Sequence, residues 1–472
     1  MDPEPQHAAR GHGGPGPAMK FQVERDVLAE AVGWVSRALP SRPVIPVLSG
    51  LLLQAADGLT LSCFDYEVSA RVEVDAEVAE PGTVLVPGRL LAEITRSLPS
   101  LPVEFADDAE GVSLTCGSAS FTLVTLPVEE YPDLPALSQT AGTVDGGDLA
   151  AAIGQVAPAA SRDDTLPLLT GVNLEVNGDI ITLAATDRYR LAMRDLPWSP
   201  ARPGASGTYL VPARTLADAA RTMAPGEPVT IRLRSDHDRD AELASEYGPG
   251  AADDPELKRS SAHAADAMIG FESGGRRLTT RLIAGEYIKY RSRFPSEFAC
   301  QADLPATPFI EAVRRVSLVA ERGSAVRLSF GGGEVTIEAE TQGRARAREI
   351  VRADFRGVEP GIAFSPHFLL DGIAAAGVIA ATPTAPEPGA GTGQETGPGT
   401  AASSRGKPAT APAESLIRLE FNSSTKPAVI TGFQLSATGD DAAPTPARAD
   451  AADPASSSFR YLVVPLRTAA RQ

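Results

Sequence analysis

The sequence predicts an α+β protein made of three copies of one unit, in which antiparallel strands alternate with helices. A hairpin pattern occurs three times, and a proline that opens a helical pattern follows each hairpin start by about 40 residues. The spacing between copies also becomes equal once one insert is removed. With 472 residues, the chain has room for about three domains of ordinary size.

The repeated hairpins begin at Gly50, Gly171 and Ala325. Each alternates apolar and polar residues on both sides of a turn that contains Gly or Asn/Asp. Such alternation is typical of paired strands with one buried face. We therefore expect a layer of antiparallel strands in every copy.

Helical patterns precede and follow each hairpin. The segments 26–39, 148–160 and 308–320 each carry one apolar stripe, which predicts an amphipathic helix. A second helix is predicted after each of Pro87, Pro212 and Pro366, because proline suits the first helical position, where its missing N–H is not needed.

The distances between copies reveal one insert. Gly171 follows Gly50 by 121 residues, whereas Ala325 follows Gly171 by 154. The excess of 33 equals the length of 235–267, which is acidic, rich in Ala, Pro and Gly, and without periodicity. The predicted organisation is a disordered tail 1–18 and three domains, 19–140, 141–302 and 303–472, with disordered inserts at 235–267, 379–415 and 437–457.

Charge limits the possible partners. The chain has 43 basic and 60 acidic residues, a net charge of −17, which argues against a surface that is basic throughout. However, the tail and the three inserts together account for −11 of this charge. A DNA partner therefore remains possible for the folded part, because arginines recur on the predicted helices. These arginines either line one surface for phosphate contact or are simply solvated.

Other functional classes lack support in the sequence. The three cysteines are far apart, which predicts neither disulfides nor a metal site, and no apolar run is long enough to span a membrane. No phosphate-binding loop or metalloprotease motif accompanies the acidic pairs, so neither a catalytic site nor a cofactor is expected. We expect a cytoplasmic protein, for which a DNA-binding role and a protein-interaction scaffold without DNA both remain open at this point.

Several segments resemble one family. They are MKFQVERDVLAEAV from Met19, SRPVIPVLSGLLLQA, FTLVTLPVEEYPDLP, TLPLLTGVNLE, LAATDRYRLA, FSPHFLLDGI and YLVVPLR. Together they are similar to the bacterial DNA polymerase III sliding clamp, the beta subunit or processivity factor, of actinobacterial type. The resemblance runs through nearly the whole chain after Met19.

The resemblance implies three clamp-type domains with helices on one side of antiparallel sheets, and a homodimer that closes head to tail into a ring. It also implies a ring that encircles double-stranded DNA without regard to sequence and tethers the replicative DNA polymerase. Further implied partners are the clamp loader, other DNA polymerases and repair proteins. No enzymatic activity, metal or cofactor is implied.

The resemblance also assigns site residues. For the pocket that receives partner peptides they are Leu169, Thr186, Arg188, Tyr189, Arg190, Leu191, Ile288, Leu462, Val464, Pro465, Leu466 and Arg467. For DNA contact they are Arg42, Arg89, Arg162 and, by analogy within the repeat, Arg214. For the dimer interface they are Phe121 and Leu318.

Two positions depart from the family pattern. Ile288 stands where the family usually has proline, and Val464 where methionine is common. An isoleucine restores a backbone N–H and replaces a rigid ring. We therefore expect a working pocket with altered selectivity for peptides or inhibitors, as in a secondary clamp. The segment before Met19 raises the further hypothesis that translation starts at Met19.

Overall fold

The computed structural model describes residues 19–108, 111–137, 139–233, 267–321, 323–341, 344–358, 361–381, 414–435 and 458–466. The chain forms two compact units. Unit 1 comprises Met1–Ala150, Trp198–Ala205 and Arg214–Gly285, and unit 2 comprises Ala151–Pro197, Ser206–Ala213 and Glu286–Gln472.

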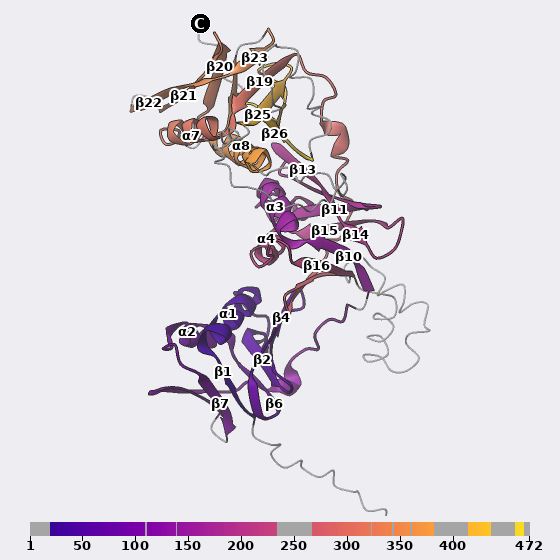
Figure 1. Ribbon diagram of the computed structural model, residues 1–472, viewed down its shortest axis with the longest axis vertical. Helices are drawn as coiled ribbons and strands as arrows, with labels where there is room; N and C mark the ends of the chain where they lie inside the picture. Colours follow the sequence, from indigo (N-terminus) through magenta and orange to yellow (C-terminus); the bar gives the residue numbers. More distant parts are fainter. Residues whose placement is uncertain are drawn as a thin grey trace, which may run out of the picture. The chain divides into compact units, whose positions relative to one another are not determined.

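Unit 1 contains two antiparallel sheets (Figure 1). The five-stranded sheet has the order β5 (Glu77–Glu80), β1 (Lys20–Val23), β7 (Val103–Asp108), β8 (Gly111–Cys116), β9 (Ala119–Leu123). The nine-stranded sheet has the order β14 (Ser199–Pro200), β10 (Gln139–Asp145), β16 (Pro228–Leu233), β17 (Met268–Ser273), β18 (Arg276–Arg281), β4 (Val68–Val74), β3 (Leu59–Phe64), β2 (Gly50–Ala55), β6 (Gly82–Pro87). The hairpin predicted from Gly50 is thus formed by β2, β3 and β4.

Helices α1 (Arg25–Val35) and α2 (Gly88–Ser97) pack against each other, and α1 also contacts β3 and β4. The apolar stripe of α1 places Leu28, Val32 and Val35 in the core. Burying each such side chain stabilises the fold by about 1.5–3 kcal/mol. Helix α2 starts directly after Pro87, as the sequence predicts. Helix α4 (Ala213–Ala220) follows Pro212, as the sequence also predicts.

Unit 2 also contains two antiparallel sheets. The nine-stranded sheet has the order β15 (Ser206–Pro212), β11 (Gly171–Asn177), β12 (Ile180–Thr186), β13 (Arg190–Pro197), β27 (Phe459–Val463), β26 (Ala428–Leu435), β25 (Glu414–Phe421), β19 (Cys300–Pro305), β23 (Asp354–Arg356). The four-stranded sheet has the order β22 (Ala345–Arg352), β21 (Glu334–Thr341), β20 (Val326–Gly331), β24 (Gly361–Phe364). The hairpins predicted from Gly171 and Ala325 both occur here.

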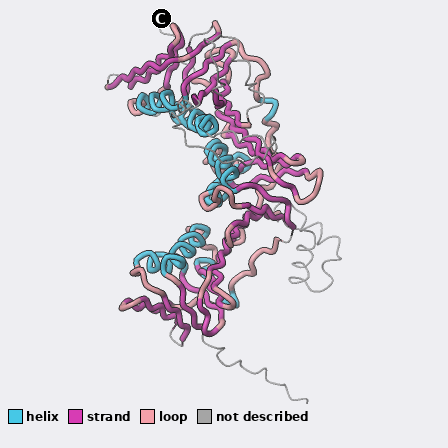
Figure 2. The backbone as a smooth tube through the Cα atoms, viewed as in Figure 1, coloured by secondary structure: helices cyan, strands magenta, loops and turns pink. Residues whose placement is uncertain are grey.

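Helices α7 (Ala306–Ser317) and α8 (Pro366–Ala381) of unit 2 lie side by side (Figure 2). Helix α8 packs on β25, β26 and β27 at very short range. A side chain on Gly432 of β26 would place its Cβ 2.0 Å from the carbonyl oxygen of Ala376 in α8. Glycine at this position therefore lets the helix and strand backbones touch.

Some boundaries differ from the prediction. Helix α8 continues to Ala381 and β25 begins at Glu414, so both ends of the segment 379–415, predicted to be a disordered insert, are regular structure. Alanine is the best helix former, and the run of small residues extends the helix. The tail 1–18, most of the predicted inserts and Arg467 lie outside the described residues.

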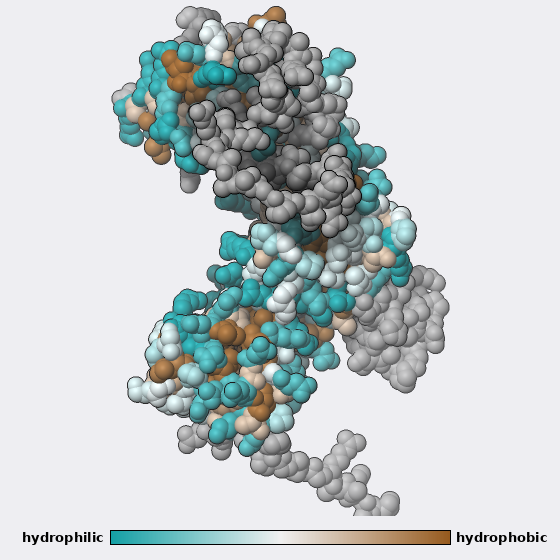
Figure 3. Space-filling model, in the orientation of Figure 1, coloured by the Kyte–Doolittle hydropathy of each residue, from teal (hydrophilic) through white to brown (hydrophobic). Residues whose placement is uncertain are grey.

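Further helical elements are α3 (Gly146–Val156) and the short helices η4 (Ala157–Ala159), η5 (Pro167–Thr170) and η8 (Arg291–Arg293). Across the described ranges, the helices are all too short or too polar to cross a bilayer. On the face drawn in Figure 3, apolar side chains form small patches among hydrophilic ones.

Candidate functional site

The turn between β12 and β13 is fixed by its own side chains. The Oδ1 atom of Asp187 accepts hydrogen bonds from the backbone N–H groups of Tyr189 and Arg190, both at 3.0 Å. Thr186 Oγ1 donates to the carbonyl of Arg190 at 2.5 Å. Arg188 takes a φ of +80°, a value uncommon for a residue with a side chain. This turn holds Tyr189 outward, with 54% of its surface exposed.

Arg190 lies at the centre of a network that joins four elements of unit 2. Its Nε donates to Asp187 at 3.0 Å, its Nη2 to the carbonyl of Pro158 at 2.5 Å, and its Nη1 to the Asp371 carboxylate and the Tyr461 hydroxyl. Only 8% of the residue is exposed. Burial acts to lower the pKa of Arg190, but these acceptors outweigh it and raise the pKa overall. The side chain is therefore a permanent, fully engaged cation.

Phe368 of α8 belongs to the same cluster, although neither the motifs nor the family resemblance point to it. Its ring stacks on Tyr189 with centroids 6.1 Å apart, and the guanidinium of Arg190 lies 4.7 Å from its centroid. Phe368 and Asp371 are three residues apart in α8, so they share one helix face. This three-residue spacing is the feature of the sequence that indicates that both side chains contact the same residue, here Arg190.

The C-terminal strand completes the cluster. Leu462 of β27 is paired with Leu191 of β13, and both are buried. Beyond the strand, the N–H of Val464 donates to the carbonyl of Tyr189 at 2.9 Å, and the N–H of Leu466 donates to that of Ala363 at 2.7 Å. Backbone hydrogen bonds thus hold this segment, while the side chains of Val464 and Leu466 remain half-buried and Pro465 is buried.

Ile288 is 39% exposed and follows a buried tyrosine, Tyr287. Burial raises the pKa of Tyr287; the backbone of Thr186 opposes this and the carboxylate of Asp187 adds to it, which places the phenol beside the turn. Leu169 is half-buried in η5, and its carbonyl accepts a hydrogen bond from Ser161 at 2.8 Å. All residues assigned to the pocket, apart from Arg467, therefore lie in described parts of unit 2.

Three of the four arginines assigned to DNA lie in unit 1. Arg42 and Arg89 are both exposed, and Arg89 donates to the carbonyl of Pro40 at 3.0 Å, two residues before Arg42. Arg214 is exposed and lines a cavity of about 390 Å³ together with Pro40. Thus Arg89 and Arg214 both lie near Pro40, two residues before Arg42. The fourth, Arg162, is an exposed loop residue of unit 2.

The two residues assigned to the dimer interface expose apolar surface. Phe121 is 38% exposed on β9, which forms one edge of the five-stranded sheet of unit 1. Leu318 is 82% exposed at the end of α7 in unit 2. In the same unit, β22 forms an edge of the four-stranded sheet. Edge strands with exposed apolar neighbours are suited to pairing with another chain.

Comparisons with known proteins agree on one family. Models of the N-terminal, central and C-terminal domains of the DNA polymerase III beta subunit match residues 19–135, 143–289 and 291–378. The chain is 51% identical over 358 residues to the beta sliding clamp of Streptomyces coelicolor, covering 76% of this chain and 88% of that protein. It is 44% identical over 356 residues to the beta sliding clamp homolog GriR of Streptomyces muensis, covering 75% and 88%.

The fold is similar to the crystal structure of the sliding clamp of Pseudomonas aeruginosa bound to griselimycin. That comparison has a TM-score of 0.70 and 22% identity, and covers 96% of this chain and all of the other. The family models together match most of the chain, as the resemblance in its motifs implies. The protein therefore belongs to the DNA polymerase III beta subunit family, the sliding clamps, which are non-catalytic processivity subunits of DNA polymerase.

Proposed function

We propose that two copies of this protein close into a ring around double-stranded DNA and hold DNA polymerases through peptides bound at the Arg190 network. The observation that carries the proposal is the convergence of the 186–191 turn and the C-terminal strand, where Tyr189 and Val464 are joined by a backbone hydrogen bond. Around it, Ile288 and Leu466 offer apolar surface to peptide anchors. Proposed partners are the replicative polymerase, the clamp loader, other polymerases and repair proteins.

Loading onto nicked circular DNA tests this function. The protein is incubated with a clamp loader and the circle, the DNA is then cut once, and both samples are separated by gel filtration. Elution with the intact circle and release from the cut DNA are expected, because only a closed ring is retained by topology. Equal retention on both forms would contradict encirclement, and the absence of retention would favour a scaffold without DNA.

Arg42 and Arg89 are proposed to contact phosphates. Replacing both with alanine should weaken binding to short duplex DNA and make the salt dependence of binding shallower. The slope of log K against log[salt] should fall in magnitude by about 1 for each phosphate that the variant no longer neutralises. Fluorescence anisotropy between 50 and 200 mM NaCl measures this slope. Arg327→Ala, an exposed arginine of unit 2, is the matched control and should leave the slope unchanged. An unaltered slope in the double variant would remove these residues from the DNA surface.

A second candidate is a specialised clamp with altered pocket selectivity. It is favoured by Ile288 at the pocket, by the relative named GriR, and by the griselimycin complex of the Pseudomonas aeruginosa clamp. Ile288→Pro should change the affinity for griselimycin or for a polymerase peptide by about fivefold to tenfold, because it fixes φ and removes an N–H. Isothermal titration calorimetry measures both ligands. Equal affinities in the variant and the parent protein would argue against specialisation through this residue.

A further inference from the structure

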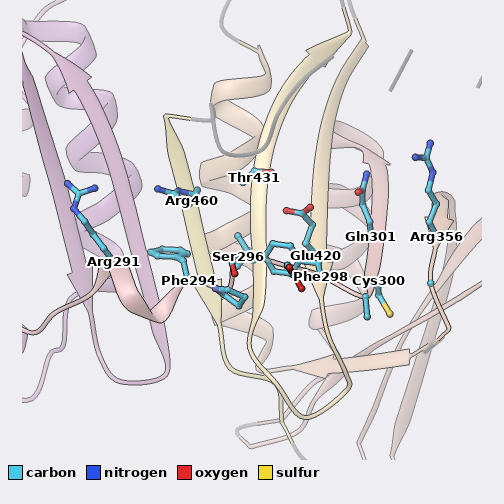
Figure 4. Close-up of a pocket in the computed structure, with 15 residues that line it drawn as sticks. Arg291, Phe294, Ser296, Phe298, Cys300, Gln301, Arg356, Glu420, Thr431 and Arg460 are labelled. Atoms are coloured by element: carbon cyan, nitrogen blue, oxygen red, sulfur yellow. The ribbon is translucent and has the colours of Figure 1, made fainter. Parts of the chain in front are cut away.

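A second cavity, away from the Arg190 network, lies within unit 2 (Figure 4). Its volume is about 670 Å³. One wall is the loop 294–299, which includes Phe294 and Phe298, and the other is the face of the nine-stranded sheet formed by β19, β25, β26 and β27. The cavity has both aromatic and charged walls, and the activity described above does not use it.

The loop that covers the cavity is held at both ends. Asn422 accepts a hydrogen bond from the N–H of Ala299 at 2.9 Å and donates to the carbonyl of Glu297 at 3.0 Å. At the other end, Arg291 donates to Glu175 at 3.3 Å and to Thr182 at 3.0 Å. Because these bonds tie the loop to strands on both sides, the cavity is part of the fold rather than a gap beneath a loose segment.

The floor of the cavity contains a buried carboxyl group. Glu420 is 5% exposed, and its side chain forms no hydrogen bond or close ion pair with another described residue. Burial raises the pKa of Glu420; the charge of Arg418 opposes this and that of Asp303 adds to it. The nearby Arg418 is engaged by both carboxylate oxygens of Asp303, at 2.7 and 2.9 Å. A buried carboxylate is costly unless a cation or a hydrogen-bond donor compensates it. Glu420 therefore offers an open acceptor to a ligand.

Charges of the opposite sign lie on both sides of Glu420. The strand register aligns Arg356 with Gln301 and Gln301 with Glu420, so these side chains share one face. At about 4.8 Å per strand, the backbone of Arg356 on β23 is about 10 Å from that of Glu420 on β25. On the other side, Leu462 of β27 is the residue aligned with Val429 and Glu420. Arg460 is two residues further along β27, so it is about 12 Å from Glu420, and its guanidinium lies over the ring of Phe294. In Figure 4 the two guanidinium groups lie on opposite sides of the Glu420 carboxyl.

We propose that this cavity binds an extended peptide segment of a partner protein with a basic residue between two acidic ones, in the order acidic, any, basic, any, acidic. The basic side chain would meet Glu420 and the hydroxyl of Thr431. Residues two positions apart in an extended chain are about 6.7 Å apart and face the same way. The two acidic side chains of the peptide would extend outward from the basic residue, one toward the guanidinium group of Arg356 and the other toward that of Arg460.

Fluorescence polarisation with a labelled ETKTE peptide and the full chain tests the proposal. ETKTE should bind and the charge-reversed peptide KTETK should not, because KTETK places bases against both arginines. Glu420→Gln should weaken ETKTE binding at least tenfold and Arg356→Ala about fivefold. Arg327→Ala, outside the cavity, and Ile288→Pro, at the Arg190 network, should leave it unchanged.

The proposal is wrong if both peptides bind equally, if neither binds, or if Glu420→Gln keeps the parental affinity. Thermal unfolding checks that the variants are folded, which is expected because Gln has the shape of Glu and the Arg418 charge keeps its two hydrogen bonds to Asp303. Should Glu420→Gln not fold, the exposed Arg356→Ala variant decides the question, since undiminished binding there also contradicts the proposal. Ile288→Pro changes the peptide pocket at the Arg190 network and not this cavity. Its effect on ETKTE binding therefore distinguishes a failure of the present proposal from a failure of the proposed peptide pocket.

Discussion

Arg190→Met is expected to lower the free energy of unfolding by about 3 kcal/mol, the lower end of the cost of breaking a buried ion pair. The substitution leaves the carboxylates of Asp187 and Asp371 without their cation, and the carbonyl of Pro158 without its donor. The lower end applies because Asp371 is 42% exposed and water can solvate it. The turn also loses its link to α8, so peptide binding should be abolished as well.

Urea and thermal unfolding, followed by circular dichroism, measure the stability, and calorimetry with a polymerase peptide measures the binding. Arg188→Met is the matched control, because Arg188 is in the same turn but exposed. It should change stability by no more than about 0.5 kcal/mol. A stable Arg190→Met variant would show that the network contributes little, and unimpaired peptide binding would place the site elsewhere.

Gly432→Ala should destabilise unit 2 by about 3 kcal/mol, the upper part of the usual range for overpacking. The new methyl group would lie 2.0 Å from the carbonyl oxygen of Ala376 and 2.8 Å from its carbon, which are backbone atoms of α8 that no rotamer change can move. The helix would have to withdraw from the sheet, and the packing of α8 on β25, β26 and β27 would loosen together.

Gly331→Ala provides the control for that substitution. Gly331 ends β20 in the same unit, and a Cβ there would have no atom within 4 Å. The free energy of unfolding of this variant should lie within about 0.5 kcal/mol of that of the parent protein. Hydrogen exchange of the amides in α8 and β26 adds a local measurement, and it should be faster in Gly432→Ala alone. Unchanged exchange and stability would mean that helix and strand can separate without cost.

The repeated elements were predictable from the sequence because their signals are local. Alternation around the turns after Gly50, Gly171 and Ala325 marks the hairpins, and the apolar stripe of α1 marks its buried face. The end of α8 was misplaced because a run of small residues is compatible with both helix and loop.

The candidate site was predictable only in part. The resemblance provides Arg190 and Leu462, but nothing in the pattern of either segment specifies that β13 and β27 pair, since 271 residues separate Arg190 from Tyr461. For the same reason Phe368 and Asp371 emerge as partners of Arg190 only once the chain is folded. The carboxyl of Glu420 was overlooked because alternation alone does not tell a solvated strand face from one covered by a loop.

The position of β27 in its sheet has a consequence for synthesis in the cell. This strand lies between β13 and β26, yet it is the last of all the described strands to leave the ribosome. At about 5–20 residues per second, β13 waits on the order of tens of seconds for this neighbour. During that time one edge of β13 lacks its hydrogen-bond partner, and the Arg190 network lacks Tyr461. In a nascent chain, the Arg190 network can therefore be completed only after β27 has been synthesised.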